Sequence, residues 1–442
     1  MKHILAGLVL SSTFVAHAWA GQPAHIYGVN LGSWLVLEPW MLPQEWLDMG
    51  GQECETCSSC IASELSFAKV YPDAINTIFA KHWDTWFMQD DVNTLKVAGI
   101  NTIRVPLGYW IVEALVDRLH ELYPQGGFNY LHQGLSWLKD ARIQVILDHH
   151  TLPRVQIPGQ MFTGNCTTDV QFYTPYNYHH TLVWTAVMTV FSHLAPDFES
   201  VFVIEAVNDP ITDATKTPDY GTFQKNFVQM IHAIELTLGI SVPSSKLFVS
   251  VSPSISNNFT AALIATFSAT GISAEVQGAL LEAVVKKSLL GYIDDGIHSF
   301  MDVNYQYNNP SNPADMMIGP QAYDNHGIAA PDPMSYMTSI CNFKHIQADA
   351  AVGNSPLWFR EWGLSTQFDA TDKFLCKWAD TQKLAYSKSA GWIVCVQLST
   401  LARQWSYLEG LKLGFLTQDP AVLHDLNVCI PYVNSTSDGT SS

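Results

Sequence analysis

Two carboxylates in this sequence stand at the ends of apolar runs, where a buried strand would give way to a loop. Asp209 follows Asn208 in the stretch VFVIEAVNDP, and Glu361 lies in the stretch PLWFREWG. A pair of facing carboxyl groups can cleave a glycosidic bond, because one protonates the leaving oxygen while the other attacks the anomeric carbon or activates water. The pair therefore predicts glycoside hydrolysis, a reaction for which we expect no metal and no organic cofactor.

Other polar side chains follow apolar runs in the same way, among them Glu38, Arg104, His150 and His326. Any one of them has the simpler interpretation of a loop cap, but their convergence at run ends favours a functional site. A neutral sugar as substrate also agrees with the aromatic content of 12%, because pyranose faces pack against Trp and Tyr rings.

Some polar residues near these ends are expected to serve the fold instead. Asp148, Glu205 and Asp302 are interpreted as structural ion-pair or hydrogen-bond partners. His149 is interpreted as a packing histidine with satisfied hydrogen bonds.

The elements that must position these residues are short apolar runs, most of them separated by amphipathic stretches. Continuous rather than alternating hydrophobicity is typical of parallel strands covered on both faces. The sequence therefore predicts an α/β fold, a single (β/α)8 TIM barrel whose site lies at the carboxyl ends of the strands. The runs begin at Ile26, Ile100, Ile143, Val201, Leu247, Pro320, Pro356 and Gly391, and helices are predicted at Trp83–Ala98, Tyr130–Ala141 and Thr222–Leu238. The segment from Ala261 to Asn312 is longer than a crossover needs and is a candidate for extra helices and a lid.

Charge and terminal segments limit the partners and the location. The 442 residues carry a net charge of −18, which argues against nucleic acid and anionic membranes as partners. Residues 1–20 show the pattern of a secretory signal peptide that is cut after Ala20. We expect a barrel domain over 21–433, a disordered tail over 434–442, and a secreted monomer, extracellular or in the cell wall. Candidate glycosylation sites are the sequons at Asn165, Asn258 and Asn434.

The chain has 8 cysteines, and three of them form a C-x-x-C-x-x-C run at Cys54, Cys57 and Cys60. Such a run can hold zinc or form disulfides. No second ligand pair follows at zinc-finger spacing, and an oxidising compartment favours disulfides. Cys395 lies inside an apolar run and is predicted to be a free buried thiol.

Four stretches resemble the signatures of glycoside hydrolase family 5, closest to its fungal exo-1,3-β-glucanase branch: GVNLGSWLVLEPW, INTIRVPLGYW, IEAVNDP and REWGLS. The resemblance runs from about Ile26 to Cys429. It implies a (β/α)8 barrel, a retaining mechanism and a β-glucan substrate, with β-1,3-glucan expected. It also implies that Glu361 is the nucleophile and that Asp209 occupies the acid/base position.

The resemblance implies substrate-binding roles for further residues. Arg104 matches the arginine that orients the nucleophile, and Trp362 follows the nucleophile as the family pattern asks. The remaining matches are Asn208 with the asparagine that holds the sugar 2-hydroxyl, Glu38 with the glutamate of the glucose subsite, His150 with the histidine of D-x-H, and His326 with the histidine of H-x-Y. An alternative alignment of strand six on DVNYQY restores a tyrosine, Tyr305, and loses His326.

The resemblance also concerns the cysteines. It places Cys341 and Cys429 where a bridge ties the last loop to the barrel. It leaves open the pairing of Cys54, Cys57, Cys60, Cys166 and Cys376.

The chain departs from the family pattern at several site positions. Asp209 stands where the family has Glu, which withdraws the acid by about 1.5 Å, and a misplacement of about 1 Å can cost about 100-fold in rate. Ile328 replaces the H-x-Y tyrosine, and Cys395 and Gln397 stand at aromatic positions of strand eight. Arg360 precedes the nucleophile where glycine is usual, with its charge facing inward or pointing away.

Three explanations of these departures stay open. The first is a glycosidase with reduced activity. The second is a non-catalytic β-glucan-binding pseudoenzyme, and the third is a wrongly spliced gene model in these segments. The linkage and the choice between exo and endo action also stay open.

Overall fold

The computed structural model describes residues 23–57, 60–237, 274–279, 298–302, 321–325, 332–342, 357–395 and 404–433, with only the backbone at 236–237, 298–302, 321–325, 357 and 360. Several predictions lie outside these residues: the signal peptide at 1–20, the tail at 434–442, the sequons at Asn258 and Asn434, and most of the segment from Ala261 to Asn312.

Eight parallel strands close into a barrel in sequence order, which confirms the predicted fold class. The strands are β1 (Ile26–Asn30), β2 (Thr102–Gly108), β3 (Gln144–Thr151), β4 (Val201–Glu205), β5 (His298–Asp302), β6 (Gln321–Asn325), β7 (Leu357–Trp362) and β8 (Gly391–Val394). Every residue of β2 and β3 is buried, as expected of strands that helices cover on the outside and side chains fill on the inside.

The barrel closes where β8 pairs with β1, from Ile26 opposite Gly391 to Val29 opposite Val394. Gly391 has φ 135°, and a Cβ atom there would lie 2.0 Å from the carbonyl oxygen of Ile26. Only glycine fits this junction, because it has no side chain and adopts positive φ readily.

The predicted strand five is wrong. The barrel strand is His298–Asp302, which pairs with β4 through Val203 and His298, whereas the predicted run from Leu247 lies outside the described residues. The stretch HSFMD is short and has polar ends, so it gives little apolar signal. Since β6 is Gln321–Asn325, the alternative alignment of strand six on DVNYQY is also wrong.

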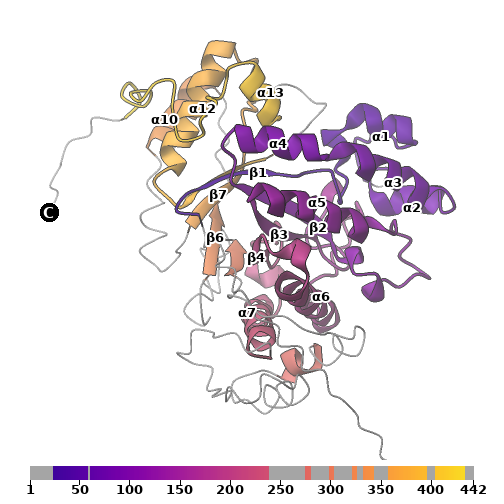
Figure 1. Ribbon diagram of the computed structural model, residues 1–442. Helices are drawn as coiled ribbons and strands as arrows, with labels where there is room; N and C mark the ends of the chain where they lie inside the picture. Colours follow the sequence, from indigo (N-terminus) through magenta and orange to yellow (C-terminus); the bar gives the residue numbers. More distant parts are fainter. Residues whose placement is uncertain are drawn as a thin grey trace, which may run out of the picture.

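Helices surround the barrel, and Figure 1 shows α10, α12 and α13 grouped on the side of β6 and β7. The longer helices are α1 (Pro43–Met49), α2 (Glu64–Val70), α3 (Ile75–Trp86), α4 (Gln89–Val97), α5 (Gly127–Ala141), α6 (Pro175–Leu194), α7 (Tyr220–Thr237), α10 (Pro333–Cys341), α12 (Asp372–Tyr386) and α13 (Tyr407–Lys412). Short 3-10 turns are η1 (Pro39–Met41), η2 (Tyr109–Ile111), η3 (Glu113–Leu115), η4 (Met161–Thr163), η5 (Pro196–Phe198) and η6 (Ala214–Lys216). No helix within the described ranges is long and apolar enough to cross a membrane.

The predicted single helix Trp83–Ala98 is in fact the end of α3 and the whole of α4. Phe87 between them is extended, with φ −135° and ψ 120°. The Asp91 carboxylate accepts a hydrogen bond from the Met88 backbone N–H at 2.8 Å. Such a side chain starts a new helix by binding a backbone donor at its N-terminus.

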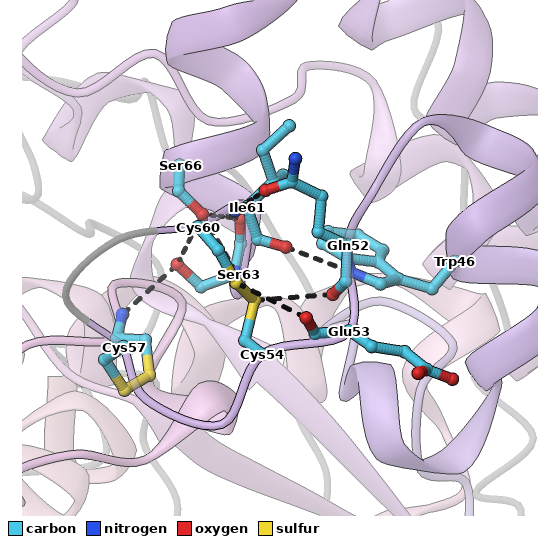
Figure 2. The surroundings of a disulfide bond; sticks show 10 residues. Trp46, Gln52, Glu53, Cys54, Cys57, Cys60, Ile61, Ser63 and Ser66 are labelled. Carbon is cyan, nitrogen blue, oxygen red and sulfur yellow. Dashed lines mark hydrogen bonds between the residues drawn. A yellow bond between two sulfur atoms is a disulfide. The ribbon is translucent and has the colours of Figure 1, made fainter.

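Two disulfides fix the loop before α2, and one of them ties it to the loop after β3. Cys54 pairs with Cys60, and Cys57 pairs with Cys166 in the loop after β3. The C-x-x-C-x-x-C run therefore forms disulfides. Figure 2 shows Trp46 and Gln52 on the side of the Cys54–Cys60 bridge, both hydrogen-bonded to the backbone of Ile61.

The predictions for Cys341, Cys429 and Cys395 are confirmed, and the state of Cys376, which was left open, is now described. Cys341 at the end of α10 pairs with Cys429 across 88 positions of the sequence, which confirms the implied bridge. Cys395 is free and buried, as predicted, and Cys376 on α12 is free and half-buried.

Candidate active site

Arg104 on β2 is the centre of a buried charge network. Its guanidinium donates to Glu205 Oε2 at 2.8 Å, contacts Asp148 Oδ2 at 2.9 Å, and donates to Glu361 Oε1 at 2.8 Å. Burial alone would lower the pKa of Arg104, but the three carboxylates raise it. The guanidinium is therefore held charged, and the prediction that Asp148 and Glu205 are structural ion partners is confirmed.

The same arginine binds two amides. Its Nη2 donates to Asn208 Oδ1 at 2.9 Å and its Nη1 to Asn30 Oδ1 at 3.1 Å. Glu361 comes from β7 and Asn208 from the turn after β4, so one guanidinium brings together residues that are far apart in the sequence. Binding of the amide oxygen to Arg104 also fixes which way the Asn208 amide faces.

Glu38 and His150 face one another beside this network. Nδ1 of His150 lies 2.6 Å from Asp148 Oδ2, and its Nε2 lies 3.7 Å from Glu38 Oε1. Trp40 Nε1 donates to Glu38 Oε2 at 3.0 Å. Within the described part of the chain, neither Glu38 Oε1 nor His150 Nε2 has a hydrogen-bond partner. Two buried polar atoms thus face one another across 3.7 Å with hydrogen-bonding capacity to spare.

The protonation of this pair follows from its burial. Burial raises the pKa of Glu38 to about 7, and the Glu361 carboxylate adds to the effect. Burial alone would lower the pKa of His150, but the Asp148 carboxylate outweighs it and the pKa is raised. Glu38 therefore changes its protonation near neutral pH, while His150 keeps its proton to a higher pH than a free imidazole does.

The two candidate catalytic carboxylates have unusual backbones. Asp209 has φ 42° and Glu361 has φ 60°, both in the left-handed region. The register of β7 against β8 shifts between Phe359 and Trp362, and such a bulge re-aims a side chain. The Glu361 side chain is 16% exposed, so it meets both Arg104 and solvent.

Cys395 at the end of β8 links these carboxylates electrostatically. Burial raises the pKa of its thiol well above the usual value, and Glu361, Glu38 and Asp209 each raise it further. All three carboxylates therefore lie in the electrostatic surroundings of one buried side chain. Printed contacts thus join Glu361, Arg104 and Asn208, and through Asp148 also His150 and Glu38, while Asp209 directly follows Asn208 in the turn after β4.

Comparison with known proteins identifies the family. The profile described as Cellulase (glycosyl hydrolase family 5) matches residues 73–396. The chain belongs to glycosyl hydrolase family 5. A probable glucan endo-1,6-beta-glucosidase B from Neosartorya fischeri is 31% identical over 440 residues, which cover 95% of this chain and 94% of the relative. A probable glucan 1,3-beta-glucosidase A from Aspergillus clavatus is 29% identical over 223 residues, which cover 50% of this chain and 49% of that relative.

The fold is shared with solved structures as well. The crystal structure of rutinosidase from Aspergillus niger superposes with a TM-score of 0.59 at 16% identity, covering 88% of this chain and 97% of that one. At this identity the likeness concerns the barrel alone.

Two half-buried tryptophans at this family 5 site were missed by the sequence analysis. Trp40 and Trp405 pack edge to face, with ring centroids 5.1 Å apart, and Trp405 also lies against Gly363. Trp40 stands in the opening motif, but no local pattern points to Trp405. Trp362, by contrast, is 2% exposed and packs edge-on against Trp392, so its contact with substrate stays a prediction.

One expectation about the family 5 strand ends is confirmed only in its packing part. His149 stacks on Trp184 with ring centroids 3.9 Å apart, but neither ring nitrogen has a hydrogen-bond partner among the described residues. Burial lowers its pKa to about 3, so the ring is neutral. His326, Ile328, Gln397 and the side chain of Arg360 lie outside what the structure describes. Within the described ranges, no group of three or more His, Cys, Asp or Glu side chains could hold a metal ion.

Proposed function

We propose that this family 5 chain hydrolyses β-glucan by a retaining mechanism, with Glu361 as nucleophile and Asp209 as acid/base. The observation that carries the proposal is the contact of one buried guanidinium, Arg104, with both Glu361 and Asn208. Arg104 thereby holds the Glu361 carboxylate of β7 near Asn208, the residue that precedes Asp209.

The steps follow from these contacts. The Glu361 carboxylate, held by Arg104, attacks the anomeric carbon while the Asp209 carboxyl gives its proton to the leaving oxygen, and a glycosyl ester forms. Water then attacks the same carbon and gives its proton to Asp209, and the ester bond breaks. Glu38, His150 and Asn208 hold hydroxyls of the sugar.

Activity is expected to be attenuated, because aspartate is one methylene shorter than the glutamate of the family pattern. The short side chain keeps the acid chemistry but holds the proton further from the leaving oxygen. The pattern of residues 1–20 supports secretion before the protein meets its substrate.

The linkage has two candidates. The opening motif favours β-1,3-glucan, whereas the relatives that match nearly the whole chain carry endo-1,6-beta-glucosidase in their names. Because the endo-1,6 relatives match a larger share of this chain, β-1,6-glucan is the favoured candidate. The substrate test therefore compares laminarin, a β-1,3-glucan, with pustulan, a β-1,6-glucan.

The deciding experiment measures sugar release from both glucans. Glu361→Gln should abolish release, and Asp209→Glu should raise it by about 10- to 1000-fold. Asp219→Glu is the matched control, because Asp219 is an exposed aspartate that also has positive φ, at 58°. An unchanged rate in Asp209→Glu would remove Asp209 from the acid role. Binding of glucan without any release by the wild-type protein would establish a non-catalytic glucan-binding protein instead.

A further inference from the structure

The turn that carries Asp209 is held on both sides by side chains from the loop after β3. Gln156 Nε2 donates to the carbonyl oxygen of Asn208 at 3.1 Å, and that carbonyl belongs to the peptide bond leading into Asp209. The hydroxyl of Tyr173 accepts from the backbone N–H of Ile211 at 2.7 Å. Pro210 has no N–H, so Ile211 is the first residue beyond Asp209 that offers a backbone donor.

Gln156 and Tyr173 act as one unit. The Tyr173 hydroxyl donates to the Gln156 carbonyl oxygen at 2.9 Å. Gln156 Nε2 also donates to the carbonyl oxygen of His150 at 2.7 Å, which joins the end of β3 to the turn after β4. Gln156 is 0% exposed and Tyr173 is 7% exposed, so water has little access to replace these bonds.

The loop reaches this position with a strained backbone. Arg154 has φ 61° and Val155 has φ 68°, and a β-branched residue such as Val rarely adopts the left-handed region. The backbone N–H groups of Gln171 and Phe172 bind the carbonyl oxygens of Arg154 and Val155 at 2.9 and 3.2 Å. Strain of this kind persists only where surrounding contacts fix it, and it concentrates at functional sites. Here it delivers the Gln156 amide to the carbonyls of Asn208 and His150.

We propose that Gln156 and Tyr173 are positioning residues for Asp209. A short acid has few torsions with which to correct its reach, so the backbone from which it extends must be fixed. The two side chains fix it through the carbonyl before Asp209 and the N–H after it. The inference rests on the proposed function, because it concerns the acid of that reaction.

The test separates loss of acid catalysis from loss of folded protein by changing the leaving group. A glucan leaving group must be protonated as its bond breaks, whereas dinitrophenolate leaves without a proton. The value of kcat/KM reports the first, acid-dependent step. The substrates are the preferred glucan and the dinitrophenyl glycoside of an oligosaccharide from the same glucan.

Tyr173→Phe removes only the hydroxyl, and Tyr178→Phe is its matched control. Tyr178 is 6% exposed and likewise donates to a backbone carbonyl, that of Pro218 at 2.7 Å, but it does not contact the Asp209 turn in any described hydrogen bond. Gln156→Met keeps a similar volume and removes the amide.

We expect Tyr173→Phe to lower kcat/KM on glucan by about 10-fold and Gln156→Met by about 10- to 100-fold, the range for a displaced general acid. On the dinitrophenyl glycoside the kcat/KM of both variants should stay within about twofold of the wild-type value. Any kcat that they lose on this substrate should be restored by azide, because azide replaces a water that needs a base. Tyr178→Phe should leave kcat/KM unchanged on both substrates.

Equal losses on both substrates, or none on glucan, would overturn the positioning role while the hydrolase function stands. A wild-type protein that cleaves neither substrate would overturn the proposed function and this inference with it. If Gln156→Met fails to fold, Tyr173→Phe alone decides, since it leaves a buried ring in place.

Discussion

Removal of the Arg104 guanidinium should destabilise the fold far more than removal of an ordinary arginine. Arg104→Met keeps a long apolar side chain but leaves the carboxylates of Asp148 and Glu205 without their buried cation. The two carboxylates are 0% and 1% exposed. Loss of one partner of a buried ion pair costs about 3–5 kcal/mol. Because Glu205 loses the guanidinium while Asp148 keeps His150 at 2.6 Å, we expect a loss within this range, about 4 kcal/mol.

The assay is urea unfolding followed by circular dichroism, with Arg118→Met as the matched control. Arg118 also binds a carboxylate, Glu113, but the two side chains are 29% and 54% exposed, so its loss should cost below about 1 kcal/mol. Arg104→Lys should fall between them, because it restores a charge without the planar fork that meets several acceptors. Similar losses in Arg104→Met and Arg118→Met would refute the view that this network is held by one buried cation.

Three further outcomes follow from the structure, the first of which concerns Glu64 at the start of α2, a residue that is 0% exposed. Burial raises the pKa of Glu64 from 4.5 to about 8, so the folded chain keeps a proton that the unfolded chain releases. Between about pH 5 and 8 the free energy of unfolding should fall by up to about 1.4 kcal/mol per pH unit, and Glu64→Gln should flatten that slope in urea titrations; parallel slopes would contradict it. Trp405→Ala should weaken glucan binding by about 3- to 10-fold in calorimetry, and an unchanged Kd would exclude the ring from the site. Replacing both Cys341 and Cys429 by Ser should lower the free energy of unfolding by about 2–5 kcal/mol, whereas Cys376→Ser, which breaks no bridge, should leave it nearly unchanged.

The sequence predicts the strands of the barrel where apolar runs are long. INTIRV and IQVILD indicate β2 and β3 because both faces of these strands are covered, so apolar and β-branched residues stand on both faces and outweigh the few polar ones. The stretch HSFMD at β5 gave none, since five residues with polar ends resemble a loop. The break between α3 and α4 was also missed, because it depends on one carboxylate, Asp91, that binds a backbone N–H.

The candidate site follows the same division. Asn208 could be predicted, because it closely follows an apolar run and such residues converge at one end of a barrel. Arg104 lies inside β2, and its role was implied by the family resemblance. Gln156 and Tyr173 could not be predicted, since they lie in an irregular loop whose path is set by tertiary contacts. His149 shows the reverse case. It was predicted to pack with both nitrogens hydrogen-bonded, but its ring stacks on Trp184 and neither nitrogen has a hydrogen-bond partner among the described residues.

The closure of β8 onto β1 has a consequence for biosynthesis. On the ribosome β1 emerges before every other strand of the barrel, but its partner β8, which begins at Gly391, emerges after all of them. Until then the nascent barrel has two open strand edges, which are templates for aggregation. Binding by chaperones during synthesis should therefore matter most before the last strand of this protein is made. A chain that stops short of Gly391 should be degraded or precipitate.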